Sequence, residues 1–442
     1  MGNNTVREMT VLPEHAHLSK KRAVVSEHVL IVGTGREFPS RVRAIRPGTV
    51  TTVICRVEYV HKLREPHQNE RVIAVRELAG DDEWIALAAA VHAQHPITRI
   101  ATVGERDQDR CAVIGAALGL PTHHPETVSR VHDKNLMRAR LRQVGLDSTA
   151  HTLANSEQEV RSFVNTHGGP CVVKPVAGAG SAGVALVRTG DDIPAAWARA
   201  SGNHKGILIA GVIVEQFHEG DQFSVEAFSE AGEHTLVSVT RKYSDPDTFV
   251  ELGHVAPSGL TCEQYELIRV YVTDVLDALG VEFGATHTEV VLSAGGPRLI
   301  ETHLRVGGDE IPGLTFDVTG VDLSDCVARQ TLGDTVMPGI RSALAERPQT
   351  GGSAIWFAAA PGAGVLESVS GEDEARAVTG VTSVELLMRP GSVIGELESS
   401  DSRVAAVRAL GDNPDEAVAA ARQGVQQLEF HLRTRARIGG TV

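Results

Sequence analysis

The sequence is short of aromatic residues, of paired cysteines and of long hydrophobic runs. Aromatic residues make up only 4% of the 442 residues, which leaves few rings for stacking on nucleic-acid bases. The five cysteines are scattered without a C-x-x-C pair, so we expect free thiols in a reducing compartment, the cytoplasm. No stretch is long and apolar enough to span a bilayer, and the polar first 25 residues lack a secretory signal. We therefore expect neither nucleic acid nor membrane as a partner.

Positive charge is also in deficit. Lysine and arginine total 42 against 56 acidic residues, which gives a formal net charge of -14. This balance argues against a polyanion as the main partner, whereas a few local lysines are enough to hold a nucleotide. We therefore expect small-molecule substrates. The sequence leaves open whether the chain forms a homodimer.

The first part of the chain alternates predicted strands and helices. Strands are expected at 28–35, 49–57, 71–78 and 97–104, and helices at 81–95 and 107–120. This alternation indicates a parallel sheet with helices on its faces. We therefore expect a Rossmann-like N-terminal α/β domain at 26–127, preceded by a mobile tail at 1–25.

The rest of the chain mixes helices, single strands and hairpins. After a linker at Pro121–Pro125, we expect a helix at 129–145 capped by Ser129, strands at 170–175 and 207–217, hairpins at 222–242 and 286–306, and a helix at 414–430. These elements suggest a central domain at 128–340 with a lid subdomain at about 168–218. A linker at 341–350 would lead to a C-terminal α/β domain at 348–434.

Two glycine-rich segments follow predicted strands. VGTG at 32–35 lacks the third glycine of G-x-G-x-x-G, so we favour a tight strand-to-helix turn over a dinucleotide site. AGAGSAG at 177–183 follows a strand that carries Lys174, and such a loop lets backbone N–H groups approach phosphate oxygens. A flexible hairpin turn is the competing interpretation of this second segment.

The hairpin at 286–306 has a register that can be tested. If its loop is Ala294–Gly296, Glu289 lies opposite Glu301 and His287 lies opposite His303 on one face of the sheet. Two adjacent carboxylates repel each other unless a cation lies between them, and Mg²⁺ takes carboxylate and phosphate oxygens. A solvated outer face is the alternative.

Seven motifs follow one another along the chain. They are D-K-x-x-M-R (133–138), VVKP with Lys174, the glycine loop, VEQFHEGDQFSVE (214–226), GH-x-x-P (253–257), H-x-E (287–289) and E-T-H-L-R-V-G-G-D (301–309). In this order they resemble the ATP-grasp superfamily, and within it the carboxylate–amine ligases similar to bacterial L-amino-acid ligases. The resemblance implies an α/β and α+β chain in which a Rossmann-like domain, a two-lobed nucleotide-binding region and a C-terminal α/β cap succeed one another.

The resemblance also implies roles for individual residues around ATP. Lys134 and Lys174 would hold phosphates, and Gln222 would meet the ribose hydroxyls, where the family pattern has glutamate. The lid residues would be Gly178, Ala179, Gly180, Ser181, Ala182 and Gly183, and the adenine contacts Glu215, Gln216 and Phe217, largely through backbone groups. Glu289 and Glu301 would bind Mg²⁺ ions that bridge the phosphates.

A second group of residues is assigned to the substrates. Arg305 and the backbone at Gly307 and Gly308 would face an acyl phosphate and a substrate carboxylate, and Lys242 and His254 would line the amino-acid pocket. Asp309 would anchor an amino group or brace the loop. His303 stands where the family pattern has asparagine, either as a metal ligand that shifts preference towards Mn²⁺ or as a donor that orients Glu301. We favour the orienting role.

The implied activity is ATP-dependent joining of a carboxylate, such as an amino acid, to an amine through an acyl phosphate, with release of ADP and phosphate. A carboxylating ATP-grasp enzyme that uses bicarbonate would share the nucleotide residues and is the first alternative. A non-catalytic nucleotide-binding protein on the same fold is the second. A nicotinamide oxidoreductase based on VGTG leaves the charged hairpin unexplained.

Overall fold

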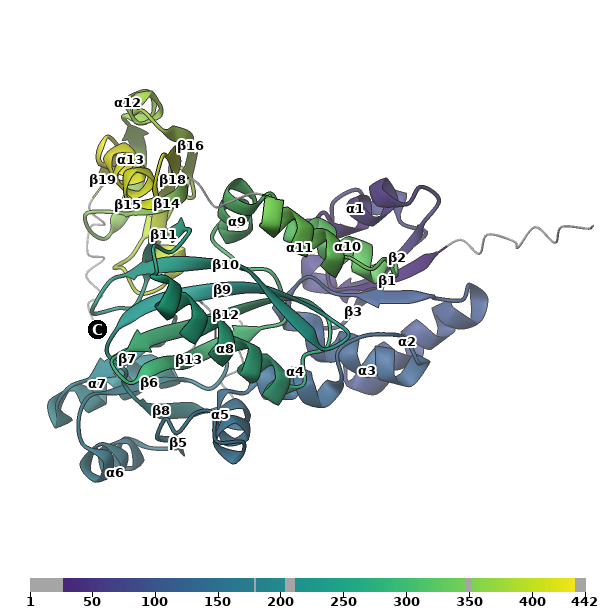
Figure 1. Ribbon diagram of the computed structural model, residues 1–442, viewed down its shortest axis with the longest axis horizontal. Coiled ribbons are helices and arrows are strands. Elements are labelled where there is room, and N and C mark those ends of the chain that lie inside the picture. Colours follow the sequence, from purple (N-terminus) through teal and green to yellow (C-terminus); the bar gives the residue numbers. More distant parts are fainter. Residues whose placement is uncertain (1–26, 179, 203–210, 347–350, 434–442) are drawn as a thin grey trace, which may run out of the picture.

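The computed structural model describes residues 27–178, 180–202, 211–346 and 351–433 (Figure 1). The predicted tail at 1–25 and Ala179 of the glycine loop lie outside these ranges. None of the described helices is both long and apolar enough to cross a membrane. The chain forms four sheets, of which the largest lies at the centre of the molecule (Figure 1).

The N-terminal sheet is parallel, with strand order β3-β2-β1-β4, as the sequence predicted. Its strands are β1 (His28–Val32), β2 (Val50–Arg56), β3 (Arg71–Val75) and β4 (Arg99–Ala101), and its helices are α1 (Phe38–Ile45), α2 (Asp81–Gln94) and α3 (Gln108–Leu118). β1 is buried along its whole length because helices cover both faces. Short 3-10 turns lie at η1 (Val57–Lys62), η2 (Pro66–Gln68) and η3 (Glu105–Asp107).

The predicted helix at 129–145 is wrong in its start and in its continuity. The structure has two helices, α4 (Pro125–His132) and α5 (Lys134–Gln143), with a break at Asp133. The Asp133 side chain accepts hydrogen bonds from the N–H groups of Asn135 and Leu136, so it caps α5 and sets Lys134 at the first helical position. Pro125 begins a helix, because a proline suits the first turn.

A small antiparallel sheet of order β5-β8-β6-β7 forms the lid region below the central sheet (Figure 1). Its strands are β5 (His151–Ala154), β6 (Cys171–Pro175), β7 (Ala185–Val187) and β8 (Val212–Gln216), with α6 (Glu157–His167), η4 (Gly190–Asp192) and α7 (Ile193–Ser201) packed on it. The glycine loop joins β6 to β7, which confirms a strand before the loop.

The central sheet has eight strands in the order β13-β12-β9-β10-β11-β14-β18-β16. They are β9 (Asp221–Glu230), β10 (Glu233–Ser244), β11 (Glu251–Ala256), β12 (Gly284–Ser293), β13 (Gly296–His303), β14 (Gly352–Ala359), β16 (Val381–Leu386) and β18 (Arg403–Gly411). Antiparallel pairing of β11 with β14 carries the sheet from the central region into the C-terminal region. Helix α8 (Cys262–Leu279) packs its apolar face on the sheet.

Five α-helices, one 3-10 turn and a second small sheet complete the described part of the fold. The remaining elements are α9 (Ile311–Thr319), α10 (Leu323–Thr331), α11 (Met337–Glu346), β15 (Gly364–Ser370), α12 (Glu372–Ala377), β17 (Val393–Ile394), η5 (Ser400–Ser402), α13 (Pro414–Gln426) and β19 (Glu429–Arg433). The linker predicted at 341–350 is wrong up to Glu346, which is still helical. The helix predicted at 414–430 ends at Gln426, and β19 then pairs with β15.

Candidate functional site

A cavity of about 280 Å³ lies between the lid sheet and the central sheet. Elements of both sheets line it, together with the start of α5 and the loop that follows β13. The predicted site residues that line it are Lys134, Lys174, Gly178, Gly180, Ser181, Ala182, Glu215, Gln216, Phe217, Gln222, Lys242, His254, Glu289, Glu301, His303, Arg305 and Gly308. Gly183 does not line the cavity, although its neighbours Ala182 and Val184 do.

The β12–β13 hairpin places Glu289 opposite Glu301 and His287 opposite His303, as the sequence predicted. The predicted reason is wrong. Near the turn Ser293 pairs with Gly296, so the connection is one residue shorter than Ala294–Gly296. A bulge between Glu289 and Val290 then shifts the register, because Ile300 is an extra residue on β13. A regular ladder would have placed the two glutamates on opposite faces.

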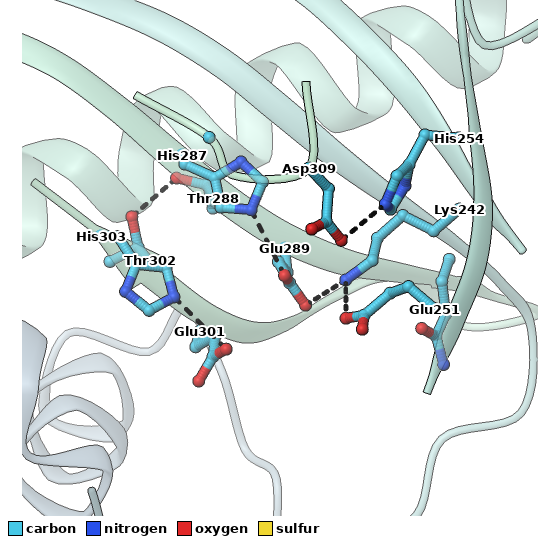
Figure 2. Close-up of polar contacts among 12 residues, drawn as sticks. Lys242, Glu251, His254, His287, Thr288, Glu289, Glu301, Thr302, His303 and Asp309 are labelled. Carbon is cyan, nitrogen blue, oxygen red and sulfur yellow. Dashed lines mark hydrogen bonds and ion pairs between the residues drawn. The ribbon is translucent and has the colours of Figure 1, made fainter. Parts of the chain in front are cut away.

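Lysines neutralise the carboxylate pair. Lys242 Nζ lies 2.6 Å from Glu289 Oε2 and 3.3 Å from Glu251 Oε1 (Figure 2). Lys134 Nζ lies 2.7 Å from Glu301 Oε2. Burial alone would raise the pKa of both hairpin carboxyls, but the neighbouring lysines outweigh it and hold each pKa well below its usual range. Both groups are therefore ionised oxygen donors at neutral pH.

Each glutamate of the pair also contacts a histidine. His287 lies 2.5 Å from Glu226 and 3.3 Å from Glu289, and His303 lies 3.3 Å from Glu301 and 3.2 Å from Glu105. Burial alone would lower the pKa of His287, but Glu226 and Glu289 raise it to about 9. The pKa of His303 is also raised, by Glu301 and Glu105, against the effect of burial.

The glutamate of the VEQF motif is buried among charged side chains. Glu215 is 2% exposed, and its carboxylate lies 2.6 Å from Lys174 Nζ and 2.6 Å from Arg138 Nη2. Burial would raise the pKa of Glu215, but Arg138 and Lys174 hold it at about 2. Burial lowers the pKa of Lys174. The side chain of Glu215 therefore positions Lys174, which is a different contribution from the backbone contact we expected.

Two arginines form ion pairs in and beside the loop that follows β13. Arg305 donates to Glu105 Oε2 from Nε at 3.0 Å and from Nη2 at 2.9 Å. Arg403, from β18, donates to both oxygens of Asp309 at 2.7 Å. His254 Nε2 lies 3.3 Å from Asp309 (Figure 2). In this arrangement Asp309 braces the loop, one of the two roles left open by the sequence.

Gly307 and Gly308, the two glycines after Arg305, have different surroundings. We had expected the Gly307 backbone to face the substrates, but its N–H donates to Glu226 Oε2 at 3.1 Å and Gly307 does not line the cavity. A Cβ at Gly307 would lie 3.0 Å from His287 Nδ1, so the close approach needs glycine. Gly308 lines the cavity and has open space at its Cβ position.

Several residues of the site escaped sequence reasoning. Arg138 and Glu226 lie inside quoted motifs but carried no assigned role, and Glu105 follows the end of a predicted strand, where parallel sheets place functional groups. Glu251 pairs with Lys242, and the Ser400 N–H donates to Gly180 O at 3.1 Å. Ser400 and Arg403 come from the C-terminal region, and no local sequence pattern connects them with this cavity.

The donor set fits a nucleotide with a divalent cation. Glu289 and Glu301 offer ionised oxygens side by side, which suits Mg²⁺, and Lys134 and Lys174 offer cations for phosphate oxygens. The glycine loop lies on the opposite wall. Elsewhere in the described residues, three side chains bring ligand atoms within 4.8 Å of one another, those of His28, Glu70 and His95. Both nitrogens of His28 there already contact His95 O and Thr52 Oγ1.

Comparison with known proteins gives two family matches. Residues 167–312 match the family model described as ATP-grasp domain, and residues 356–433 match the model described as L-amino acid ligase C-terminal domain 2. The protein y4rH of Sinorhizobium fredii is 29% identical over 71% of this chain and 64% of its own length. Alanine–anticapsin ligase of Bacillus subtilis is 28% identical over 47% of this chain and 48% of its own length. The chain thus covers less than two thirds of these curated relatives.

A solved structure shows the same fold along nearly the whole chain. The L-amino acid ligase of Bacillus licheniformis superimposes with a TM-score of 0.77 and 22% identity, over 92% of this chain and 99% of that one. Arg403 lies in the C-terminal match. Residues 167–312 are therefore similar to ATP-grasp domains, and residues 356–433 to C-terminal domain 2 of the L-amino acid ligases.

Proposed function

We propose that the protein is an ATP-dependent ligase that joins a carboxylate, an amino acid in the first instance, to an amine. The observation that carries the proposal is the paired Glu289 and Glu301, flanked by Lys242 and Lys134, which face the glycine loop across one cavity. The C-terminal match to L-amino acid ligases and the similarity to alanine–anticapsin ligase support an amino-acid substrate.

The reaction begins with activation of the carboxylate. A carboxylate is a poor acyl donor, because oxide would have to leave, whereas phosphate leaves readily once the γ-phosphoryl group of ATP has been transferred to it. ADP is the first product. The amine then attacks the carbonyl carbon, the bond to phosphate breaks, and the nitrogen loses a proton as the amide forms. Positioning and charge neutralisation supply most of the catalysis in such transfers.

The residues of this chain divide that work. Lys134 and Lys174 would bind phosphate oxygens, and Glu289 and Glu301 would hold Mg²⁺, which supplies further positive charge when bound. Mn²⁺ is the alternative cation if His303 takes part as a ligand. His303 contacts two carboxylates through its two ring nitrogens, which favours the orienting role.

The substrate side rests on Arg305 and the loop after it. A guanidinium can hold a carboxylate or phosphate through two parallel hydrogen bonds, and Arg305 here donates from Nε and Nη2 to one oxygen of Glu105. We propose that the acyl group meets Arg305 and the Gly308 backbone. Lys242 and His254 complete the wall on β10 and β11, where they are direct neighbours.

The glycine loop is suited to protecting the acyl phosphate from water. Ser181 Oγ donates to Phe249 O at 2.8 Å, and Ser400 N–H donates to Gly180 O, so the loop is tied to the central sheet and to the C-terminal region. Exclusion of water matters because acyl phosphates hydrolyse. The loop therefore has contacts that hold it over the cavity.

The decisive experiment is a screen of amino acids, singly and in pairs, for ATP-dependent phosphate release, with mass spectrometry of the products. Release that requires an amino acid and an amine, and does not change with bicarbonate, supports the ligase. Release that requires bicarbonate instead favours the carboxylating alternative. Binding of ATP without ADP formation in any mixture favours a non-catalytic nucleotide-binding protein. Glu301→Gln serves as the inactive control.

Two further proposals concern the location and the assembly of the protein. We propose a cytoplasmic protein, because all five cysteines are free thiols. We also propose a homodimer as its assembly, which light scattering on the purified protein would test directly. A monomeric mass at micromolar concentration would reject that assembly without affecting the proposed reaction.

A further inference from the structure

A second cavity of about 290 Å³ lies between the N-terminal sheet and the central region. Its lining includes Gly35–Phe38 in the turn that leads from β1 to α1, Ile100–Val103 at the end of β4, and residues of α10. The strand order β3-β2-β1-β4 places the change in chain direction between β1 and β4. In open parallel sheets, ligands bind beyond the carboxyl ends of the strands at that point. The cavity thus lies where this fold favours a ligand.

The charged lining of this second cavity is mostly positive. It contains four arginines, Arg36, Arg41, Arg99 and Arg305, and one acid, Glu37. The total charge of the chain is strongly negative, so this local excess of arginine is not a consequence of composition. Clefts lined by one sign of charge concentrate ligands of the other sign.

Two of the four arginines have unused hydrogen-bond donors. Arg41 pairs with Asp322 at 2.9 Å, and Arg305 pairs with Glu105. Within the described part of the chain, Arg36 makes neither a hydrogen bond nor an ion pair. The buried Nε of Arg99 has no hydrogen-bond partner, although it forms a 3.6 Å ion pair with Glu27. Guanidinium groups with free donors match the geometry of carboxylate and phosphate.

The turn after β1 and an aromatic pair in the lining also support an anion site. Gly35 and Arg36 both have left-handed conformations, with φ of 68° and 50°, so the turn after β1 is fixed in a shape that places Arg36 at the cavity. A Cβ at Gly35 would lie 2.7 Å from Ile31, which explains the glycine. His123 stacks on Phe283 in the lining of the cavity, and burial lowers its pKa to about 4, so it is neutral. This part of the lining therefore adds no charge that opposes the arginines.

Arg305 connects the two cavities, because it lines both. We infer that the second cavity binds the amine substrate through a carboxylate or phosphate group that this substrate carries. This inference rests on the proposed ligase function for the word amine, but not for the anion site itself. The chain would thereby select amines with an anionic group over neutral amines, and would place that group on the side of Arg305 away from the nucleotide.

The anion site can be tested without any catalysis. The full chain is saturated with a non-hydrolysable ATP analogue and Mg²⁺, so that the first cavity is filled, and is then titrated calorimetrically with succinate or with inorganic phosphate. We expect saturable binding of at least one anion, and the preferred anion identifies the group that the substrate carries. Arg36→Gln and Arg99→Gln should each weaken it about tenfold, as expected for a lost charge-assisted hydrogen bond.

The matched control is Arg71→Gln. Arg71 begins β3 at the opposite end of the same sheet and donates to Gln94 at 2.7 Å, so its loss changes the net charge equally. Arg36 is exposed, so its substitution is not expected to affect folding even if that of Arg99 does. No binding of either anion to the wild-type protein, displacement of the analogue by the anion, or equal weakening in Arg71→Gln would overturn the inference.

A kinetic measurement then connects the site with the substrate. Arg36→Gln should raise the KM of an anionic amine substrate about tenfold and leave the KM of ATP unchanged. With the same amine in which the anionic group is replaced by an amide, wild type and variant should be equal. An unchanged KM for the anionic amine overturns the substrate assignment. If no amine supports phosphate release, the proposed ligase function fails, whereas the titration still decides the anion site.

Discussion

Arg403 and Asp309 form a two-point ion pair between the C-terminal region and the active-site loop. Arg403 Nη1 and Nη2 each lie 2.7 Å from one oxygen of Asp309. The guanidinium carbon of Arg403 lies 3.8 Å from the centre of the Phe357 ring. Burial would raise the pKa of Asp309, but His254 and Arg403 hold it well below its usual range. The loop that carries Arg305 and Gly308 is therefore fixed by a residue almost a hundred positions away.

The first prediction concerns this pair. Arg403→Met should lower kcat/KM by about tenfold or more, because Asp309 and His254 lose the contact that positions them. Arg403→Lys should restore only part of the loss, since lysine cannot make two parallel hydrogen bonds. Steady-state phosphate release measures both. Arg376→Met, an exposed arginine of the same region, is the control and should behave as wild type.

The second prediction concerns the carboxylate pair. Glu289→Gln and Glu301→Gln should each reduce kcat by roughly 10²- to 10³-fold, because each removes a charged oxygen from the proposed Mg²⁺ site. Titration with Mg²⁺ should show a weaker apparent affinity in both variants. Glu266→Gln, on the exposed face of α8, supplies a variant with the same chemical change and should keep full activity. Near wild-type activity in either hairpin variant would remove these residues from the site.

The third prediction is the pH dependence of stability that Glu215 confers. Its pKa lies at about 2 in the folded chain, below its ordinary value of 4.5, so its contribution is complete above about pH 4.5 and disappears as the pH falls towards 2. Glu215→Gln leaves Lys174 and Arg138 buried without a carboxylate and should lower the free energy of unfolding by about 3–5 kcal/mol at pH 7. Urea unfolding at pH 7 and at pH 3 should show a smaller difference at the lower pH. An equal difference at both values would contradict this assignment.

The fourth prediction separates the two roles of His303. If it orients Glu301, His303→Asn should lower kcat severalfold with Mg²⁺ and with Mn²⁺ alike, because asparagine still donates one hydrogen bond. If it is a ligand, the loss should be confined to Mn²⁺. Phosphate release in each metal measures the ratio. Unchanged rates in both metals would leave His303 without either role.

The sequence predicted the parallel N-terminal sheet and the opposed glutamates, because both depend on local patterns. The pairing of Glu289 with Glu301 was correct although its derivation was not, since a shorter turn and a bulge at Ile300 gave the same result as a longer turn. The helix at 129–145 failed because the Asp133 side chain competes with the helix and caps a new one.

Contacts between distant segments were beyond the reach of the sequence. Arg403 lies on β18 and Asp309 lies in the loop between β13 and α9, and no periodicity of the sequence encodes a contact between them. The position of Arg305 against Glu105 likewise depends on how the N-terminal sheet docks against β13. Both contacts depend on how distant segments pack together, and local patterns in the sequence do not encode such packing.

The shared ladder of β11 and β14 has a practical meaning for chimeras. Residues Gly253–Ala256 of β11 pair with residues Ser353–Trp356 of β14, and this ladder joins the C-terminal region to the central region. A chain cut between α11 and β14 would expose β11 as a bare edge, and bare edges recruit other molecules into aggregates. The same cut would remove Arg403 from Asp309. The C-terminal region is thus not an exchangeable module, and recombination with relatives should keep β9 to β18 from one parent.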